Sequence, residues 1–175
     1  MKTNNLKDKA MQSIEDTKWI PKSSKNRIQS MVENRPDWCV SRQRSWGVPL
    51  TIFINKNTGE PLKDEKVMER IIEDVKRKGS DVWLSENPLK YLEKDYNPDD
   101  YYAVKDILDV WFDSGTSHAF VLENNNLSWP ADLYLEGTDQ HRGFFQSSLL
   151  VACGTRGEAP YKNVITHGFV LDGQG

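Results

Sequence analysis

Two apolar runs that flank an amphipathic segment near the C-terminus constrain the fold most. The first run is Leu133-Tyr134-Leu135, and the second covers residues 163–171. Residues 139–153 between them have the spacing of a helix, with Thr138 or Asp139 as the N-cap. A strand, a helix and a second strand in this order predict a βαβ unit with parallel strands. We therefore expect an α/β fold.

Shorter signals predict the elements that precede this unit, after a mostly polar stretch at residues 1–22. They are an extended piece at residues 18–21, a helix from Ser24 that Pro36 stops, strands within residues 38–54, and a helix from Asp64 to about Lys78. Gly79 follows three basic residues and is a standard helix end.

The composition excludes several classes of protein. A formal net charge of −3 over 175 residues argues against binding nucleic acid through bulk positive charge. Six residues each of Trp, Tyr and Phe make the chain too aromatic for a disordered segment. No apolar run approaches the ~18 residues that a membrane span needs. Cys39 and Cys153 cannot form a disulfide framework, so a cytoplasmic location is expected.

Polar residues fill the junction between the first apolar run and the predicted helix, where the sequence reads Glu136-Gly137-Thr138-Asp139-Gln140-His141. In an open α/β sheet, ligands bind at the carboxyl ends of the strands. Asp139 could accept hydrogen bonds from a ribose, Glu136 could pair with a cationic group, and Gly137 lets the backbone approach a ligand. The residues by themselves leave open that the acidic groups are ordinary helix caps.

Two further groups of residues have a functional and a structural interpretation. Trp111, Phe112, Phe144 and Phe145 could line an apolar pocket or belong to the core. Arg42, Arg44 and Trp46 could contact phosphates and stack on a base, or lie on a surface hairpin. The three histidines lack the spacing of metal ligands, and no glycine-rich phosphate loop or nucleophile elbow is present. We predict no metal site.

Three long stretches carry a resemblance to a known family. They are Asn34-Arg35-Pro36-Asp37-Trp38-Cys39-Val40-Ser41-Arg42-Gln43-Arg44-Ser45-Trp46-Gly47-Val48-Pro49, Asp106-Ile107-Leu108-Asp109-Val110-Trp111-Phe112-Asp113-Ser114-Gly115, and the block from Trp129 through Glu136-Gly137-Thr138-Asp139-Gln140-His141-Arg142-Gly143 to Thr166-His167-Gly168-Phe169. In this order they resemble the isoleucyl-tRNA synthetases, which are class I aminoacyl-tRNA synthetases. The resemblance is weakest over residues 60–104.

The resemblance implies that the chain is an internal part of such an enzyme. The family's His-Ile-Gly-His signature and its editing domain are absent, and its Lys-Met-Ser-Lys-Ser loop would follow Gly175. The expected organisation is a return segment from the editing insertion at residues 1–33, strands of the catalytic domain at 34–59, an inserted helical segment at 60–104, and the second half of a Rossmann-like nucleotide-binding domain at 105–175.

The resemblance also implies an activity: ATP with Mg²⁺ activates isoleucine to an adenylate, and the isoleucyl group passes to tRNA. The isoleucine carboxylate attacks the α-phosphate of ATP, so no catalytic nucleophile of the protein is needed. The expected partners are isoleucine, ATP, tRNA and the missing parts of the enzyme, with no membrane. Alternatives are a non-catalytic piece that binds adenylate or tRNA weakly, and a different nucleotide-binding α/β protein.

The family's site residues map onto this chain as follows. Those expected to bind the isoleucyl-adenylate are Glu136, Gly137, Asp139, Gln140, Trp111 and Phe144. His167 and Gly168 are expected on the ATP side, and Arg42, Arg44 and Trp46 remain candidates for binding tRNA. The family usually has Trp at the position of Phe144, which keeps that wall apolar but makes it smaller.

Overall fold

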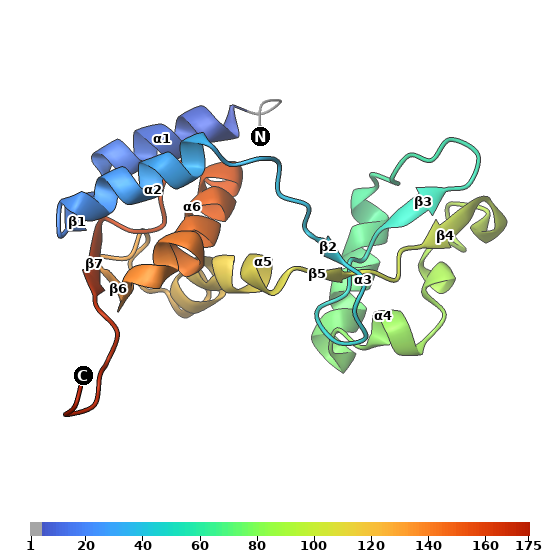
Figure 1. The fold of residues 1–175 in the computed structure, drawn as a ribbon. Coiled ribbons are helices and arrows are strands. Elements are labelled where there is room, and N and C mark those ends of the chain that lie inside the picture. The colour runs from blue at the N-terminus through green and yellow to red at the C-terminus, as the bar shows by residue number, and fades with distance from the viewer. Residues whose placement is uncertain (1–4) are drawn as a thin grey trace. The chain divides into compact units, whose positions relative to one another are not determined.

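A computed structural model describes residues 5–175 and divides the chain into two compact units (Figure 1). We call residues up to Cys39 together with Val110–Gly175 the sheet unit, and Val40–Asp109 the middle unit. No helix in the described part of the chain is long and apolar enough to cross a membrane.

The sheet unit contains a parallel three-stranded sheet in the order β1 (Lys18–Ile20), β7 (Asn163–His167), β6 (Tyr134–Gly137). The central strand β7 aligns Val164 with Trp19 on one side and with Tyr134 on the other. The parallel pairing of β6 with β7 across a helical segment confirms the predicted βαβ unit and the α/β class.

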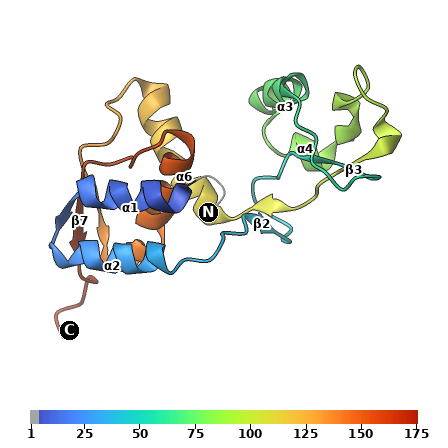
Figure 2. The same ribbon diagram turned by 90° about the horizontal axis from the view of Figure 1, so that it is seen from above.

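Helices supply the rest of the sheet unit, and α1 (Leu6–Asp16) contacts both α2 (Ser23–Glu33) and α6 (Phe144–Thr155). Figure 2 shows α1 and α2 side by side. Every residue of α6 from Phe145 to Cys153 is buried, so this helix lies inside the unit. Its shorter helices are α5 (Val110–Gly115), η3 (His118–Leu122), η4 (Glu123–Asn125) and η5 (Thr138–Arg142). The core that results includes Ile14, Trp19, Ile28, Phe145, Leu149, Tyr161 and Val164.

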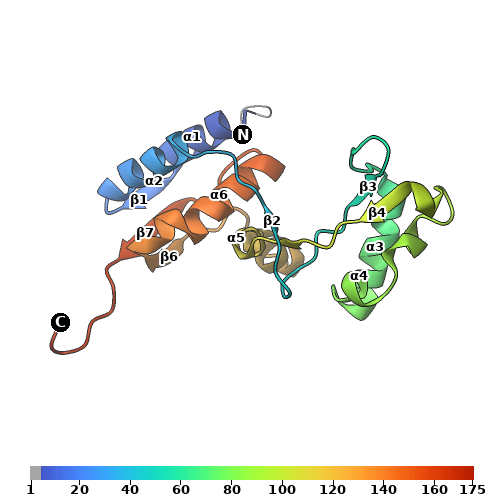
Figure 3. The same ribbon diagram turned by 45° about the vertical axis from the view of Figure 1, so that its right-hand side comes forward.

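The middle unit has two antiparallel pairs, β2 (Ser41–Arg42) with β5 (Ile107–Leu108) and β3 (Phe53–Asn55) with β4 (Tyr101–Ala103). Figure 3 shows β3 and β4 side by side. Its helices are α3 (Glu65–Lys78), α4 (Val82–Ser85), η1 (Pro88–Tyr91) and η2 (Pro98–Asp100). Its core consists of Phe53, Val67, Ile71, Trp83, Tyr91 and Leu92.

Helix α3 confirms the prediction at both ends. The side chain of Asp64 accepts hydrogen bonds from the backbone N–H groups of Lys66 and Val67, which is an N-cap. The hydroxyl of Tyr96 donates to the same carboxyl group at 2.7 Å. These hydrogen bonds lower the pKa of Asp64. Gly79 ends the helix with φ of 87°, a conformation that favours glycine.

Three expectations need correction, and one element was not predicted. The last strand ends at His167 rather than at residue 171, because residues 168–171 are exposed and unpaired. Residues 138–142 form the 3₁₀ turn η5, so α6 begins only at Phe144. Residues 38–40 and 48–52 lie outside the strands, and Pro49 forms only an isolated antiparallel bridge to Ile107. The polar N-terminal stretch, for which no element was predicted before residue 18, contains α1, which buries Ala10, Ser13 and Ile14.

Candidate functional site

The carboxyl ends of β6 and β7 lie side by side. In the register of the sheet, Glu136 is opposite Thr166 and Gly137 is opposite His167. The residues that follow each strand therefore begin at the same edge of the sheet. The predicted residues on β6 and those on β7 come together there, as expected for a ligand site in a parallel sheet. Glu136 and His167 are exposed and accessible to a ligand.

Gly137 is buried between two of the predicted site residues. A β-carbon at this position would lie 2.5 Å from Oδ1 of Asp139 and 3.9 Å from Cε1 of His167. The carboxylate and the imidazole thus lie next to the Gly137 backbone. Any larger residue would displace the Asp139 carboxylate, so the arrangement requires glycine at position 137.

Gln140 fixes the orientation of the Asp139 carboxylate. Its Nε2 donates to Oδ2 of Asp139 at 3.0 Å, and its Oε1 accepts the backbone N–H of Phe144 at 3.0 Å. The amide thereby links the exposed carboxylate to the first turn of α6. Asp139 keeps lone pairs for further donors, such as the hydroxyl groups of a sugar.

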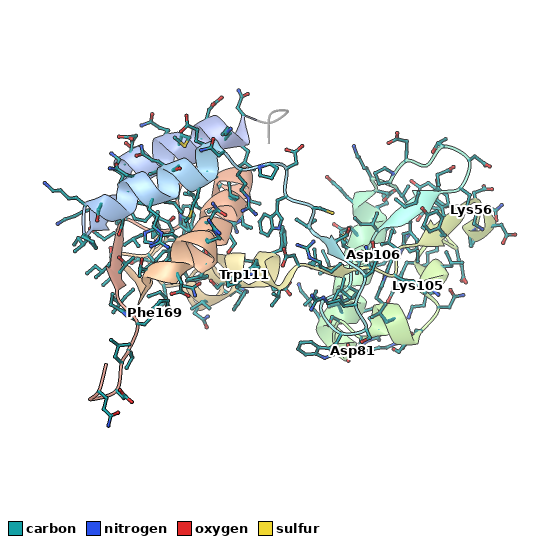
Figure 4. The ribbon with its side chains drawn as sticks, viewed as in Figure 1. Lys56, Asp81, Lys105, Asp106, Trp111 and Phe169 are labelled. Atoms are coloured by element: carbon teal, nitrogen blue, oxygen red, sulfur yellow. The ribbon has the colours of Figure 1, made fainter. Side chains whose placement is uncertain are left out.

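Trp111 of α5 is labelled in Figure 4. Its ring lies close to Gly143 of the same segment. A β-carbon at Gly143 would lie 2.8 Å from the Trp111 ring and 2.7 Å from Oε1 of Gln140. The indole is 43% exposed, so part of its surface remains open to a ligand. Phe144 instead stacks on Tyr134, with ring centroids 5.0 Å apart and an angle of 1° between the rings. It packs against the core of the sheet unit.

A pocket of about 380 Å³ opens beside these strand ends. Its lining residues are Pro21, Ser23, Ser24, Arg27, Thr138, His141, Thr166, His167 and Gly168. Sequence reasoning placed His167 and Gly168 here but missed the residues of α2. No local signal marks Ser24 or Arg27, because they reach the pocket from more than 100 residues away in the chain.

His141 forms a wall of this pocket and is fully buried. Its Nδ1 lies 2.6 Å from the carbonyl oxygen of Thr138, which can only accept, so Nδ1 carries the hydrogen. Burial lowers the pKa of His141, which favours the neutral ring. Its Nε2 is buried with no hydrogen-bond partner among residues 5–175, and the ring stacks on Trp19. His141 therefore supports the segment that carries Asp139.

The candidates for binding tRNA, which are Arg42, Arg44 and Trp46, belong to the middle unit. Nη2 of Arg42 forms an ion pair with Oδ2 of the buried Asp109 at 2.5 Å. Arg44 is exposed, and Trp46 is 88% exposed. Within residues 5–175 there is no cluster of three or more His, Cys, Asp or Glu side chains able to hold a metal ion.

Comparison with known proteins identifies relatives along the whole chain. The family described as "tRNA synthetases class I (I, L, M and V)" matches residues 1–175. The isoleucine–tRNA ligase of Pelagibacter ubique is 53% identical over 176 residues, which cover 100% of this chain and 19% of the relative.

Two other isoleucine–tRNA ligases show the same pattern. The enzyme of Gluconobacter oxydans is 52% identical over 97% of this chain and 18% of its own length. That of Aquifex pyrophilus is 52% identical over 97% of this chain and 33% of its own length. The chain spans about a fifth of the length of the first relatives, at 19%, 18% and 20%. The match over all 175 residues shows that the chain belongs to the class I tRNA synthetases.

Proposed function

We propose that this chain is a segment of an isoleucine–tRNA ligase and forms part of its adenylate site. The observation that carries the proposal is the edge of the parallel sheet where Gly137, Asp139 and His167 lie together. The names of relatives that are 52–54% identical support isoleucine as the amino acid. Residues 105–175 would be the second half of a Rossmann-like catalytic domain, 34–59 further strands of it, 60–104 an inserted helical segment, and 1–33 the return from an editing insertion.

In this proposal the side chains bind and orient the substrates. The carboxylate of isoleucine attacks the α-phosphate of ATP, the new bond is an acyl phosphate, and pyrophosphate leaves with Mg²⁺ that accompanies the nucleotide. Asp139 accepts hydrogen bonds from the ribose, and Glu136 pairs with the ammonium group of isoleucine. The rate gain from this segment comes from holding the reacting groups in place. No residue of it acts as a nucleophile.

We assign the residues that line the site from the same arrangement. The open face of Trp111 provides apolar contact for the isoleucine side chain, and Phe144 backs this wall while its ring stacks on Tyr134. Gly168 lets the backbone approach the adenine. In the middle unit, Arg44 and Trp46 are placed on the surface where a phosphate and an unstacked base of tRNA can reach them. Arg42 supports this loop through Asp109. We propose a cytoplasmic location, because translation takes place there.

A chimeric enzyme tests the proposal. Residues 1–175 replace the matched segment of the Pelagibacter ubique isoleucine–tRNA ligase, and exchange of labelled pyrophosphate into ATP is measured. We expect exchange that depends on isoleucine. Glu136→Ala should weaken it, whereas Glu158→Ala, at an exposed position away from the strand ends, should leave it unchanged.

The parent enzyme is the positive control. A folded chimera that is inactive while the parent is active, or one that prefers leucine or methionine, would contradict the proposal. Equal exchange by the Glu136→Ala and Glu158→Ala chimeras would remove the role of Glu136.

A further inference from the structure

Helix α2 makes two hydrogen bonds to the strand ends that hold the proposed ligand site. Nη1 of Arg27 donates to Oγ1 of Thr138 at 2.6 Å. The hydroxyl groups of Ser24 and Thr166 are 3.1 Å apart. Thr138 comes directly after Gly137 on the β6 side, and Thr166 comes directly before His167 on β7. One helix thus contacts both segments, and Ser24 and Arg27 also line the pocket beside the strand ends.

Thr138 is held at two points. Arg27 binds its side chain, and Nδ1 of the buried His141 donates to its carbonyl oxygen at 2.6 Å. Because Thr138 lies between Gly137 and Asp139, its position sets the direction in which the Asp139 carboxylate leaves the backbone. The Asp139 carboxylate packs against the Gly137 backbone, since Oδ1 lies 2.5 Å from where a β-carbon at position 137 would be.

The Arg27 guanidinium interacts with the Thr138 hydroxyl rather than with a carboxylate. Within residues 5–175, its guanidinium forms no ion pair with a carboxylate, and its hydrogen-bond partner is the Thr138 hydroxyl. Lys25 on the same helix differs, because its Nζ forms an ion pair with Glu15 of α1 at 2.5 Å. Arg27 is exposed, and a hydrogen bond from its charged guanidinium is stronger than one between neutral groups. Arg27 therefore acts on Thr138, the residue that directly follows β6.

We propose that Arg27 is a positioning residue for nucleotide binding, acting through Thr138 on the Asp139 carboxylate. Ser24 acts in the same way through Thr166 on His167. The inference rests on the proposed function, because it assigns the positioned side chains to the nucleotide. Misplacing them by a fraction of an ångström weakens binding of the ribose without touching the isoleucine pocket.

Kinetics of the chimeric enzyme test the inference. Arg27→Ala should raise the KM for ATP about tenfold, the value of one charge-assisted hydrogen bond, and leave the KM for isoleucine within about twofold. Arg27→Lys should recover part of the loss. Thr138→Val should resemble Arg27→Ala, and the double variant should be no worse than either, because both remove the same bond. Lys25→Ala is the matched control on the same helix and should change neither KM.

A second measurement does not depend on activity. Hydrogen exchange of the backbone segment from Thr138 to Gln140 in the same chimera should become faster in Arg27→Ala and not in Lys25→Ala. Unchanged exchange and unchanged KM for ATP would overturn the inference, as would an equal rise in both KM values together with a lower thermal midpoint, which indicates a structural role only. If Arg27→Ala fails to fold, Thr138→Val carries the same test. An inactive chimera whose Arg27→Ala variant still exchanges faster would contradict the proposed function and leave the positioning role standing.

Discussion

A β-carbon at position 137 would clash with a neighbouring side chain, although the backbone dihedral angles of Gly137 suit any amino acid. The residue has φ of −63° and ψ of 154°, which any amino acid adopts. The nearest atom to an added methyl group would be the end of the Asp139 side chain at 2.5 Å, which can rotate away. We therefore predict that Gly137→Ala in the chimera weakens pyrophosphate exchange by displacing Asp139. The thermal midpoint should change little.

Gly154 in α6 provides the matched control. An added β-carbon there would meet Leu6 at 3.8 Å, an ordinary contact. Gly154→Ala should stabilise the protein by about 0.4–1 kcal/mol, because alanine loses less backbone freedom on folding. Its exchange activity should match that of the unmodified chimera. Equal loss of activity in the two variants would show that the Asp139 clash is not the cause.

At the scale of elements, α6 supplies several of the buried residues in the core of the sheet unit. Leu149 is 0% exposed and packs in the cluster that joins α6 to α1, α2 and the sheet. Leu149→Ala should lower the free energy of unfolding by about 2–5 kcal/mol, since it removes buried apolar contacts and leaves a cavity. Leu127→Ala, at a position that is 55% exposed, should stay within about 0.5 kcal/mol. Urea denaturation of the chimera measures both, and similar losses would contradict the packing described for α6.

Helix α3 carries a titratable group that links stability to pH. The carboxyl group of Asp74 is buried and binds Nζ of Lys90 and the hydroxyl of Tyr91 at 2.8 Å each, and it also pairs with Arg77. These partners hold the pKa of Asp74 well below its ordinary value of 3.8. A lowered pKa in the folded state stabilises the fold above that ordinary value, and the stabilisation is lost as pH falls below it.

We therefore predict that the free energy of unfolding falls as the pH is lowered below about 4. Asp74→Asn should be less stable at neutral pH and should show a shallower fall. Asp81→Asn, which changes an exposed carboxyl group, is the control and should follow the original curve. Parallel curves for Asp74→Asn and the original protein would show that another group controls the pH dependence.

At the scale of the whole molecule, the chain spans about a fifth of the relatives it matches, with 19% of the first. We predict that residues 1–175 alone catalyse no isoleucine-dependent pyrophosphate exchange. In the proposed function this site binds and orients the substrates, whereas the donors to the phosphates belong to the His-Ile-Gly-His and Lys-Met-Ser-Lys-Ser signatures, which are not in this sequence. Each such donor typically lowers the barrier by about 2.7–4 kcal/mol. Strand β6 is also at the edge of its sheet, with Leu135 56% exposed, so low solubility is expected.

The assay mixes the purified chain with ATP, isoleucine and labelled pyrophosphate. Exchange well above that of a boiled sample would show that the chain is a catalyst by itself. The chimera from the same preparation is the positive control.

Local sequence was sufficient for several elements of this protein. Asp64 and Gly79 define the ends of α3 because capping and a left-handed glycine act within one turn. The βαβ unit follows from two apolar runs and the segment between them, and it brings the ends of β6 and β7 to one edge. The grouping of Glu136, Gly137 and His167 was therefore predictable from residues 133–167.

Only the tertiary structure decided which other elements pack around that unit. The three-residue strand β1 joins the sheet because it pairs with β7, 145 positions later along the chain from Lys18 to Asn163. The polar helix α1 forms because its few buried residues pack on α2 and α6. Arg27 and Ser24 reach Thr138 and Thr166 by the same long-range packing. Such contacts leave no local pattern, because their free energy comes from partners that are distant in sequence and adjacent only after folding.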